Sequence, residues 1–178
     1  MLNTLRFHLT TVTPLRFLQY FMHLPGVEWM APKSPQAECA FQLCMYLIEM
    51  QLQFVDFLQF KPSTVAAAVL YTVRAHCHTV LAQQADPHRS PPPFEWSAHM
   101  EQATRHSALD LQPCAQVLYQ HWTSLTTAGS QALLAAQAGA APPQVGGNKC
   151  LAVYRKYTKE KHGMVSQIRL LQPPFQNL

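Results

Sequence analysis

The chain has 178 residues, of which 48% are hydrophobic and only 12% are charged, and its formal net charge is +4. This length suits one domain with a sizeable core rather than two, and the charged share is about half of the ~25% usual in soluble domains. The basic residues are scattered, which argues against a nucleic-acid-binding protein. Only residues 154–163 are locally cationic, and we interpret them as a solvated helix end rather than a phosphate or nucleic-acid footprint.

The sequence predicts neither a signal peptide nor a transmembrane helix. Residues 1–14 lack a continuous hydrophobic stretch and a small-residue cleavage site, and no run of about 18 apolar residues occurs anywhere. The chain contains five cysteines in apolar, helix-like contexts, without CxxC spacing. We therefore expect an intracellular protein with reduced core cysteines. These cysteines are Cys39, Cys44, Cys77, Cys114 and Cys150.

Two helices are predicted near the N-terminus, and each starts with a hydroxyl residue followed by proline. Thr13 and Pro14 begin the first helix, and Pro25 and Gly26 end it. The second helix, over residues 34–51, repeats the same start signal. Apolar residues at helical spacing give both segments a wide hydrophobic face, so we expect both to pack into a core.

A third helix is predicted in the stretch FKPSTVAAAVLYTVR, which covers residues 60–74 and has no charge between Lys61 and Arg74. Pro62 lies near its first turn, and apolar residues follow on every side. A helix that is apolar all round is enclosed by other helices. The alanines at positions 66–68 would let neighbouring backbones approach closely, so we expect this helix at the centre of the fold.

The second half of the chain is predicted to hold shorter helices between two loops. Residues 83–97 should form a Pro-rich loop, because consecutive prolines cannot sit inside a helix. A helix is expected over residues 98–105, and another begins at Ser107, where Asp110 completes a capping box. Pro113 should bend or loosen the helix that begins at Ser107.

The C-terminal part combines a low-complexity segment with a short helix. Residues 126–148 are rich in Ala, Gly, Gln and Pro, and we predict a poorly ordered loop with at most one helical turn around Leu133 and Leu134. A short helix over residues 149–157 and an extended tail follow. Strand signals are almost absent, so the fold class is all-α, with about five helices around the alanine-rich one.

No catalytic, metal or cofactor site is predicted. His76, Cys77 and His78 are consecutive, and neighbours on a helix point about 100° apart, so they do not converge on one ion. We interpret them as the C-terminal half of a helix, with protonated histidine near the negative end of the helix dipole. Cys77 or Cys114 as a nucleophile would need a spatial partner that the sequence does not show.

Four segments carry distinctive residue combinations. Residues 2–23 join a leucine-rich end to a Thr-Pro start, residues 60–74 carry Pro-Ser and an alanine run, residues 109–122 carry Pro-Cys, and residues 154–178 carry Lys-Tyr, Val-Ser and Pro-Pro. In this order they resemble the C-terminal box of the mitotic, A- and B-type, cyclins. The residues that carry the resemblance, mostly structural ones, are Thr13, Pro14, Phe17, Leu18, Pro62, Ser63, Ala66, Ala67, Tyr71, Pro113, Cys114, Lys156, Tyr157, Val165 and Ser166.

The resemblance implies a C-terminal cyclin-box domain over residues 13–178, with residues 1–12 as the end of the last helix of a first box plus a linker. It implies a non-enzymatic regulator in cell-cycle control, in the nucleus or cytoplasm, whose partner is a cyclin-dependent protein kinase. Nucleic acid, membrane, small-molecule substrates and cofactors are not among the implied partners. The implied mechanism is allosteric, because a cyclin holds a kinase helix and its activation loop in the active arrangement.

The chain departs from the family pattern in three ways. The proline of the family's Asp-Pro-Phe-Leu is missing at positions 56–58, the loops at 83–97 and 126–148 look expanded, and the first box is absent apart from residues 2–9. Two alternatives therefore stay open: a stand-alone helical adaptor, or truncated gene model, that activates no kinase, and a small thiol enzyme. The missing box would also expose an apolar, partner-facing patch, formed by Leu2, Leu5, Phe7, Tyr20 and Phe21.

Overall fold

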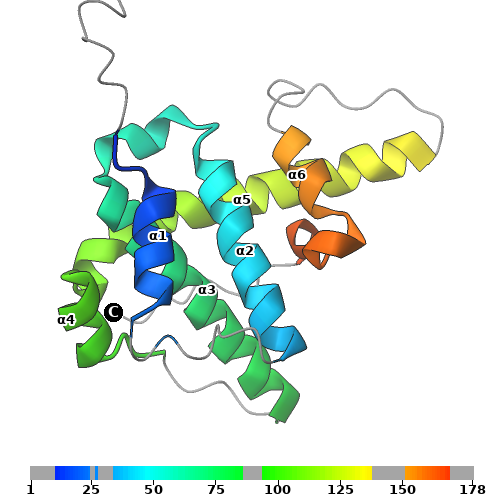
Figure 1. Cartoon of the computed structure of the whole chain (residues 1–178). Helices are drawn as coiled ribbons and strands as arrows, with labels where there is room; N and C mark the ends of the chain where they lie inside the picture. The colour runs from blue at the N-terminus through cyan, green and yellow to red at the C-terminus, as the bar shows by residue number, and fades with distance from the viewer. Residues whose placement is uncertain (1–10, 25–26, 28–33, 86–93, 138–150, 169–178) are drawn as a thin grey trace, which may run out of the picture.

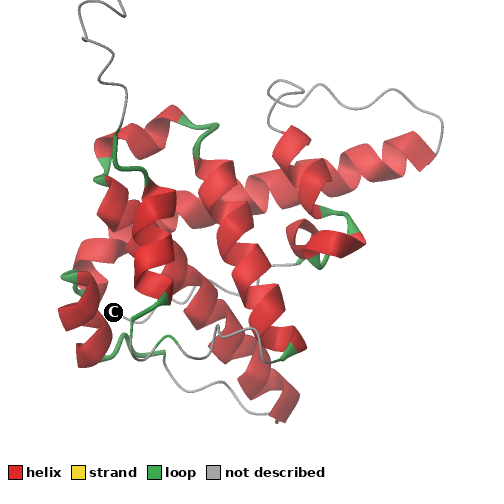
Figure 2. Cartoon of the chain, viewed as in Figure 1, coloured by secondary structure: helices red, strands yellow, loops and turns green. Residues whose placement is uncertain are grey.

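The computed structural model describes residues 11–24, 27, 34–85, 94–137 and 151–168, and this part of the chain contains helices and no strand (Figure 2). The all-α fold class is therefore confirmed, with six α-helices in the described residues where about five were predicted. The elements in chain order are α1 (Pro14–Met22), α2 (Pro35–Gln51), η2 (Val55–Gln59), α3 (Pro62–Ala85), α4 (Ala98–Thr104), α5 (Ala108–Gln137), α6 (Leu151–Tyr157), η3 (Glu160–His162) and η4 (Val165–Gln167), where η marks a 3-10 helix.

The predicted helix starts occur where the sequence placed them. Thr13 is the N-cap of α1 in extended backbone, although its side chain makes no capping hydrogen bond. At the start of α2, the Ala37 amide donates to Ser34 Oγ at 3.2 Å. The capping box of α5 is reciprocal, because the Asp110 amide donates to Ser107 Oγ at 3.2 Å and the Ser107 amide donates to Asp110 Oδ2 at 3.0 Å. Each of these bonds satisfies an amide that the first helical turn leaves without a partner.

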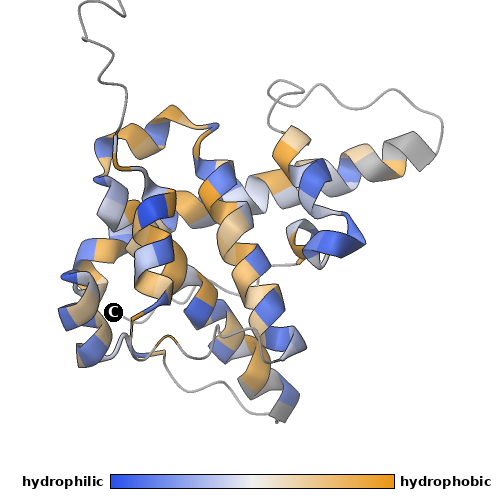
Figure 3. Ribbon diagram, in the orientation of Figure 1, coloured by the Kyte–Doolittle hydropathy of each residue, from blue (hydrophilic) through white to orange (hydrophobic). Residues whose placement is uncertain are grey.

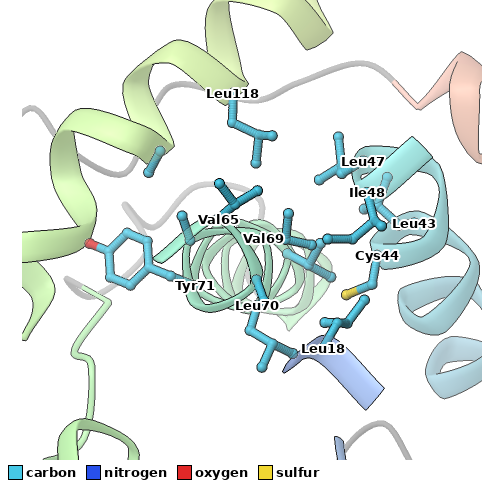
Figure 4. Close-up of a cluster of buried hydrophobic side chains, with 14 of the residues drawn as sticks. Leu18, Leu43, Cys44, Leu47, Ile48, Val65, Val69, Leu70, Tyr71 and Leu118 are labelled. Carbon is cyan, nitrogen blue, oxygen red and sulfur yellow. The ribbon is translucent and has the colours of Figure 1, made fainter. Parts of the chain in front are cut away.

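Helix α3 lies at the centre of the bundle, with α1, α2 and α5 around it (Figures 1 and 4). Every residue from 65 to 73 is buried. Seen along its axis, α3 faces Leu43 and Leu47 of α2 on one side, Leu18 of α1 below and Leu118 of α5 above (Figure 4). Hydrophobic and hydrophilic residues alternate along the surrounding helices (Figure 3), and the buried ones are mainly hydrophobic. The expected enclosure of this segment is therefore observed.

The alanines at positions 66–68 of α3 are enclosed in this core, and Ala67 has no exposed surface. We expect Ala67→Leu to overpack the core and to lower the free energy of unfolding by about 1–3 kcal/mol. Urea denaturation measures this loss. The matched control is Ala152→Leu, at an exposed helical position, which should change stability by less than about 0.5 kcal/mol. Equal stability of both variants would contradict the central position of α3.

Helix α3 is longer than the sequence predicted. It continues to Ala85, so the Pro-rich loop does not begin at residue 83. The apolar enclosure ends earlier, because residues 76–80 are only half-buried. Residues 86–93, with the three prolines, lie outside the described part of the chain. Residues 94–97 have no helical structure and lead directly into α4.

Helix α5 runs through residues 126–137, so the loop predicted to begin at residue 126 is wrong for these residues. Alanine, glutamine and leucine favour helix, and the hydroxyls of Thr127 and Ser130 donate to carbonyls one turn earlier, at 2.9 and 2.8 Å. This half of α5 extends past the rest of the bundle with α6 beside it (Figure 1). Residues 138–150 lie outside the described part. Helix α5 also continues through Pro113, and the bend expected there stays a prediction.

The contact between α5 and α6 depends on the absence of a side chain at Gly129. A Cβ atom placed there would overlap the ring of Tyr154, which is 1% exposed. Ala128 and Ala132, on the same stretch of α5, are buried with Leu151 of α6 in a small cluster of their own. Small residues on α5 therefore permit the close approach of α6.

We expect Gly129→Ala to lower the free energy of unfolding by about 1–3 kcal/mol because of this overlap. Helix propensity alone would favour the same change by roughly 0.5–1 kcal/mol, so the sign of the effect is diagnostic. Thermal melting should show the loss. The exposed neighbour Ser130→Ala provides the control. In a Tyr154→Leu background the penalty should shrink, and a double-mutant cycle measures that coupling; a stabilising Gly129→Ala would contradict the packing.

Candidate functional site

Burial raises the thiol pKa of each of the four cysteines that the structure describes. The four cysteines of the described residues are free, and Cys44 and Cys114 are fully buried. Burial raises the pKa of Cys77 to about 11 and the pKa of Cys114 to about 12. Because the thiolate is the reactive form, neither residue is poised for nucleophilic catalysis. Cys150 lies outside the described residues.

We expect Cys77 and Cys114 to react slowly in the folded chain, because at neutral pH fewer than about one in a thousand Cys77 thiols is ionised. In a variant with Cys39 and Cys150 replaced by serine, modification by Ellman's reagent at pH 7.5 should be at least tenfold slower than after unfolding in guanidinium. Rapid modification of either residue in the folded state would revive the thiol-enzyme alternative.

The His-Cys-His triplet lies in the C-terminal half of α3, as predicted, but not in its last turn. The ring of His76 meets Trp122 of α5 edge-on, with 5.6 Å between the ring centres. Burial lowers the pKa of His76, so a neutral imidazole is favoured in the fold. This corrects the interpretation of a protonated histidine near the helix end. The described residues contain no group of three or more His, Cys, Asp or Glu side chains that could hold a metal ion.

The motif residues Lys156 and Tyr157 attach α6 to α2 through Glu49. Lys156 Nζ donates to both carboxylate oxygens of Glu49, at 2.5 and 2.8 Å, and the Tyr157 hydroxyl donates to Glu49 Oε1 at 2.9 Å. Burial, followed by the Glu49 contact, raises the pKa of Tyr157. Val165 and Ser166 are fully buried in η4. These residues act in packing within the described structure.

The remaining motif residues are distributed over α1, α3 and α5 and do not form one site. The buried ones are Leu18, Ala66, Ala67, Tyr71 and Cys114; the half-buried ones are Pro14, Phe17 and Ser63; the exposed ones are Thr13, Pro62 and Pro113.

The predicted apolar patch is only partly observed. Tyr20 is 61% exposed, whereas Phe21 is 3% exposed and belongs with Leu18 to the main core. This corrects the prediction for Phe21, because a side chain enclosed in the core is not available to a partner. Leu2, Leu5 and Phe7 lie outside the described residues.

A second exposed apolar surface was missed by the sequence analysis. Leu52, Val55 and Leu58 are 72%, 79% and 82% exposed, and we call them the η2 surface. Side chains three residues apart in a 3-10 helix lie above one another, so Val55 and Leu58 share one edge of η2. Phe57 is buried on the other side. The signal in the sequence was an apolar residue at every third position of a short helix link.

The η2 surface is held in place by His121 of α5. His121 Nε2 lies 2.8 Å from Asp56 Oδ2, and the imidazole stacks on the ring of Phe54 with 3.8 Å between centres. The Gln59 side-chain amide donates to the Asp56 carbonyl at 2.8 Å. Figure 1 shows η2 at the end of the bundle where α1 begins. A surface ordered before binding loses less conformational entropy when a partner arrives.

The bundle as a whole is an all-α domain built around an alanine-rich helix, and no helix of its described part is long and apolar enough to cross a membrane. The family described as "Cyclin, C-terminal domain" matches residues 12–171. The chain therefore belongs to the cyclin family, as a C-terminal cyclin domain, and the resemblance found in the sequence is confirmed.

The curated relatives are A- and B-type cyclins at modest identity. The chain is 28% identical to cyclin-A3-3 of Arabidopsis thaliana over 74% of this chain and 36% of that protein. It is 32% identical to cyclin-A1-2 of the same plant over 67% of this chain and 23% of the relative. It is 28% identical to the G2/mitotic-specific cyclin-B of Dictyostelium discoideum over 66% of this chain and 22% of the relative. The matched region thus spans about a third or less of each relative.

Proposed function

We propose that this chain is a non-enzymatic regulator that binds a cyclin-dependent kinase in cell-cycle control, inside the cell, in the nucleus or cytoplasm. Membership of the cyclin family carries the proposal. The fold adds a physical means of binding, because the η2 surface exposes three large apolar side chains on a segment that His121 ties to α5. Contiguous exposed apolar patches mark interaction sites, and these three side chains are proposed to form such a patch. Residues 1–12 are proposed as the end of a first box plus linker, and residues 13–178 as the C-terminal domain.

The proposed mechanism is a shift of the kinase between two arrangements. A regulator changes this equilibrium only by the difference between its binding free energies for the two states. Burial of apolar side chains supplies roughly 25 cal/mol per Å² of area, and it favours the arrangement in which the kinase offers a matching apolar surface. The η2 surface is proposed to make that contact, and Tyr20 is a further candidate because it is also exposed.

Binding of the purified chain to a panel of cyclin-dependent kinases, by biolayer interferometry, tests the proposal. The double variant Val55→Glu/Leu58→Glu should weaken binding at least tenfold, since each change places a charge in an apolar contact. Leu109→Glu is the control, because Leu109 is exposed to a similar degree, 68%, outside η2. No binding by the unaltered chain, either alone or joined to the first box of a relative, would refute kinase binding and leave the family assignment standing.

Kinase activation is a separate measurement that distinguishes a regulator from an adaptor. Histone phosphorylation by the kinase should rise when the chain joined to a first box is added, and the η2 double variant should reduce that rise. Binding without any rise would favour the stand-alone adaptor. This second function stays a candidate because the chain matches only 36% of the length of one relative and 22% of another.

A further inference from the structure

Three exposed basic residues lie in α6 and in the turn that follows it, Arg155, Lys159 and Lys161, and we call them the basic edge. All three residues are exposed, and Figure 3 shows the turn after α6 as strongly hydrophilic. Lys156, in the same stretch, is paired with Glu49. Among the residues that the structure describes, no carboxylate forms an ion pair with Arg155, Lys159 or Lys161. Glu160 lies between the two lysines in sequence and offsets only part of their charge.

The backbone that carries the two lysines is fixed. The His162 amide donates to the Lys159 carbonyl at 2.9 Å, and the Gly163 amide donates to the Glu160 carbonyl at 2.8 Å. The distance between His162 Nδ1 and Gln42 Oε1 of α2 is 3.2 Å, within hydrogen-bond range. Its centre is 4.8 Å from that of the Tyr157 ring. The lysines are therefore presented from a folded turn that is anchored on α2 and α6.

This turn holds a strained residue next to the basic edge. Met164 has a φ of 52°, in the left-handed region that non-glycine residues rarely adopt, and its side chain is 47% exposed. The preceding Gly163 is also left-handed, with a φ of 64°. Strained backbone of this kind concentrates at functional positions. Methionine adapts its shape to a partner's apolar side chains.

The surroundings favour an acidic protein segment over nucleic acid. Tyr154 and Tyr157, which alternate with the basic residues, are 1% and 2% exposed, so the edge offers no aromatic platform for bases. Nucleic-acid binding also gains its affinity from contacts of many cations with phosphates, and this edge supplies three. The dipole of α6 accounts for Arg155 in its last turn, but not for Lys159 and Lys161, which lie beyond the helix.

We propose that Arg155, Lys159 and Lys161 form a docking surface for an acidic segment of a partner protein, with Met164 contacting an apolar side chain of that segment. The cations complement the carboxylates of the segment. This surface is distinct from the η2 surface, and the proposal does not depend on kinase binding.

Fluorescence anisotropy of the full chain with a fluorescein-labelled Glu/Leu peptide tests the proposal. The peptide should bind, more weakly as salt rises, and its Gln/Leu counterpart should not bind. Lys159→Glu/Lys161→Glu should weaken binding at least tenfold, and Lys159→Gln/Lys161→Gln should weaken it less. Met164→Ser should weaken binding of the Glu/Leu peptide but not of a Glu/Ser peptide. Thermal melting of each variant verifies that it is folded.

The matched control is Arg16→Glu/Lys61→Glu, which changes the net charge equally at exposed positions outside the edge. It should change the affinity by less than about twofold. Equal loss in both double variants would overturn the proposal, because binding would then follow net charge alone. Failure of the unaltered chain to bind the acidic peptide, or tighter binding of duplex DNA at physiological salt, would also overturn it. The η2 double variant should bind the peptide normally, which keeps this result separate from the kinase experiment.

Discussion

The burial of α3 is the constraint on which the other elements depend. Its segment from residue 65 to residue 73 is fully enclosed, so α1, α2 and α5 must each present an apolar face to it (Figure 4). The alanines at positions 66–68 set how closely those helices approach. Interiors are packed as densely as organic crystals, and a shift of α3 would therefore be transmitted to every helix around it. The exposed surfaces are attached to this packed core by contacts of their own, such as those of His121 with Asp56 and of His162 with Gln42.

The C-terminal elements are joined to this core by a different kind of interaction. Helix α6 lies on the small residues of α5 around Gly129 and is tied to α2 by the hydrogen bonds of Glu49 with Lys156 and Tyr157. Val165 and Ser166 of η4 are buried. The basic edge is therefore displayed by a layer that depends on α5 continuing well past the main core. If α5 ended at residue 125, Ala128 and Ala132 would no longer be held on a helix against Leu151.

Sequence reasoning predicted what local signals determine. The N-caps at Ser34 and Ser107 and the enclosed alanine helix depend on residue type and periodicity, which are visible in the chain itself. The extension of α5 was missed because low-complexity composition says nothing of the packing of Ala128 and Ala132 on α6. The burial of Phe21 and the exposure of Leu58 were missed for a related reason. Periodicity shows that a segment is amphipathic, but not which of its apolar residues finds a neighbour. That depends on contacts between elements distant in sequence, such as His121 with Asp56.

The residues that identify the family and the residues proposed to carry function are largely different. Leu18, Ala67 and Tyr71 support the family resemblance and are buried, so they determine the fold and have no surface to offer a partner. The η2 surface and the basic edge are exposed and contribute little to the core, so their composition can change without loss of the fold. A chain could therefore keep its cyclin-type core and still differ from its relatives in its partners. Core substitutions test the fold assignment, whereas only surface substitutions that leave stability unchanged test the function.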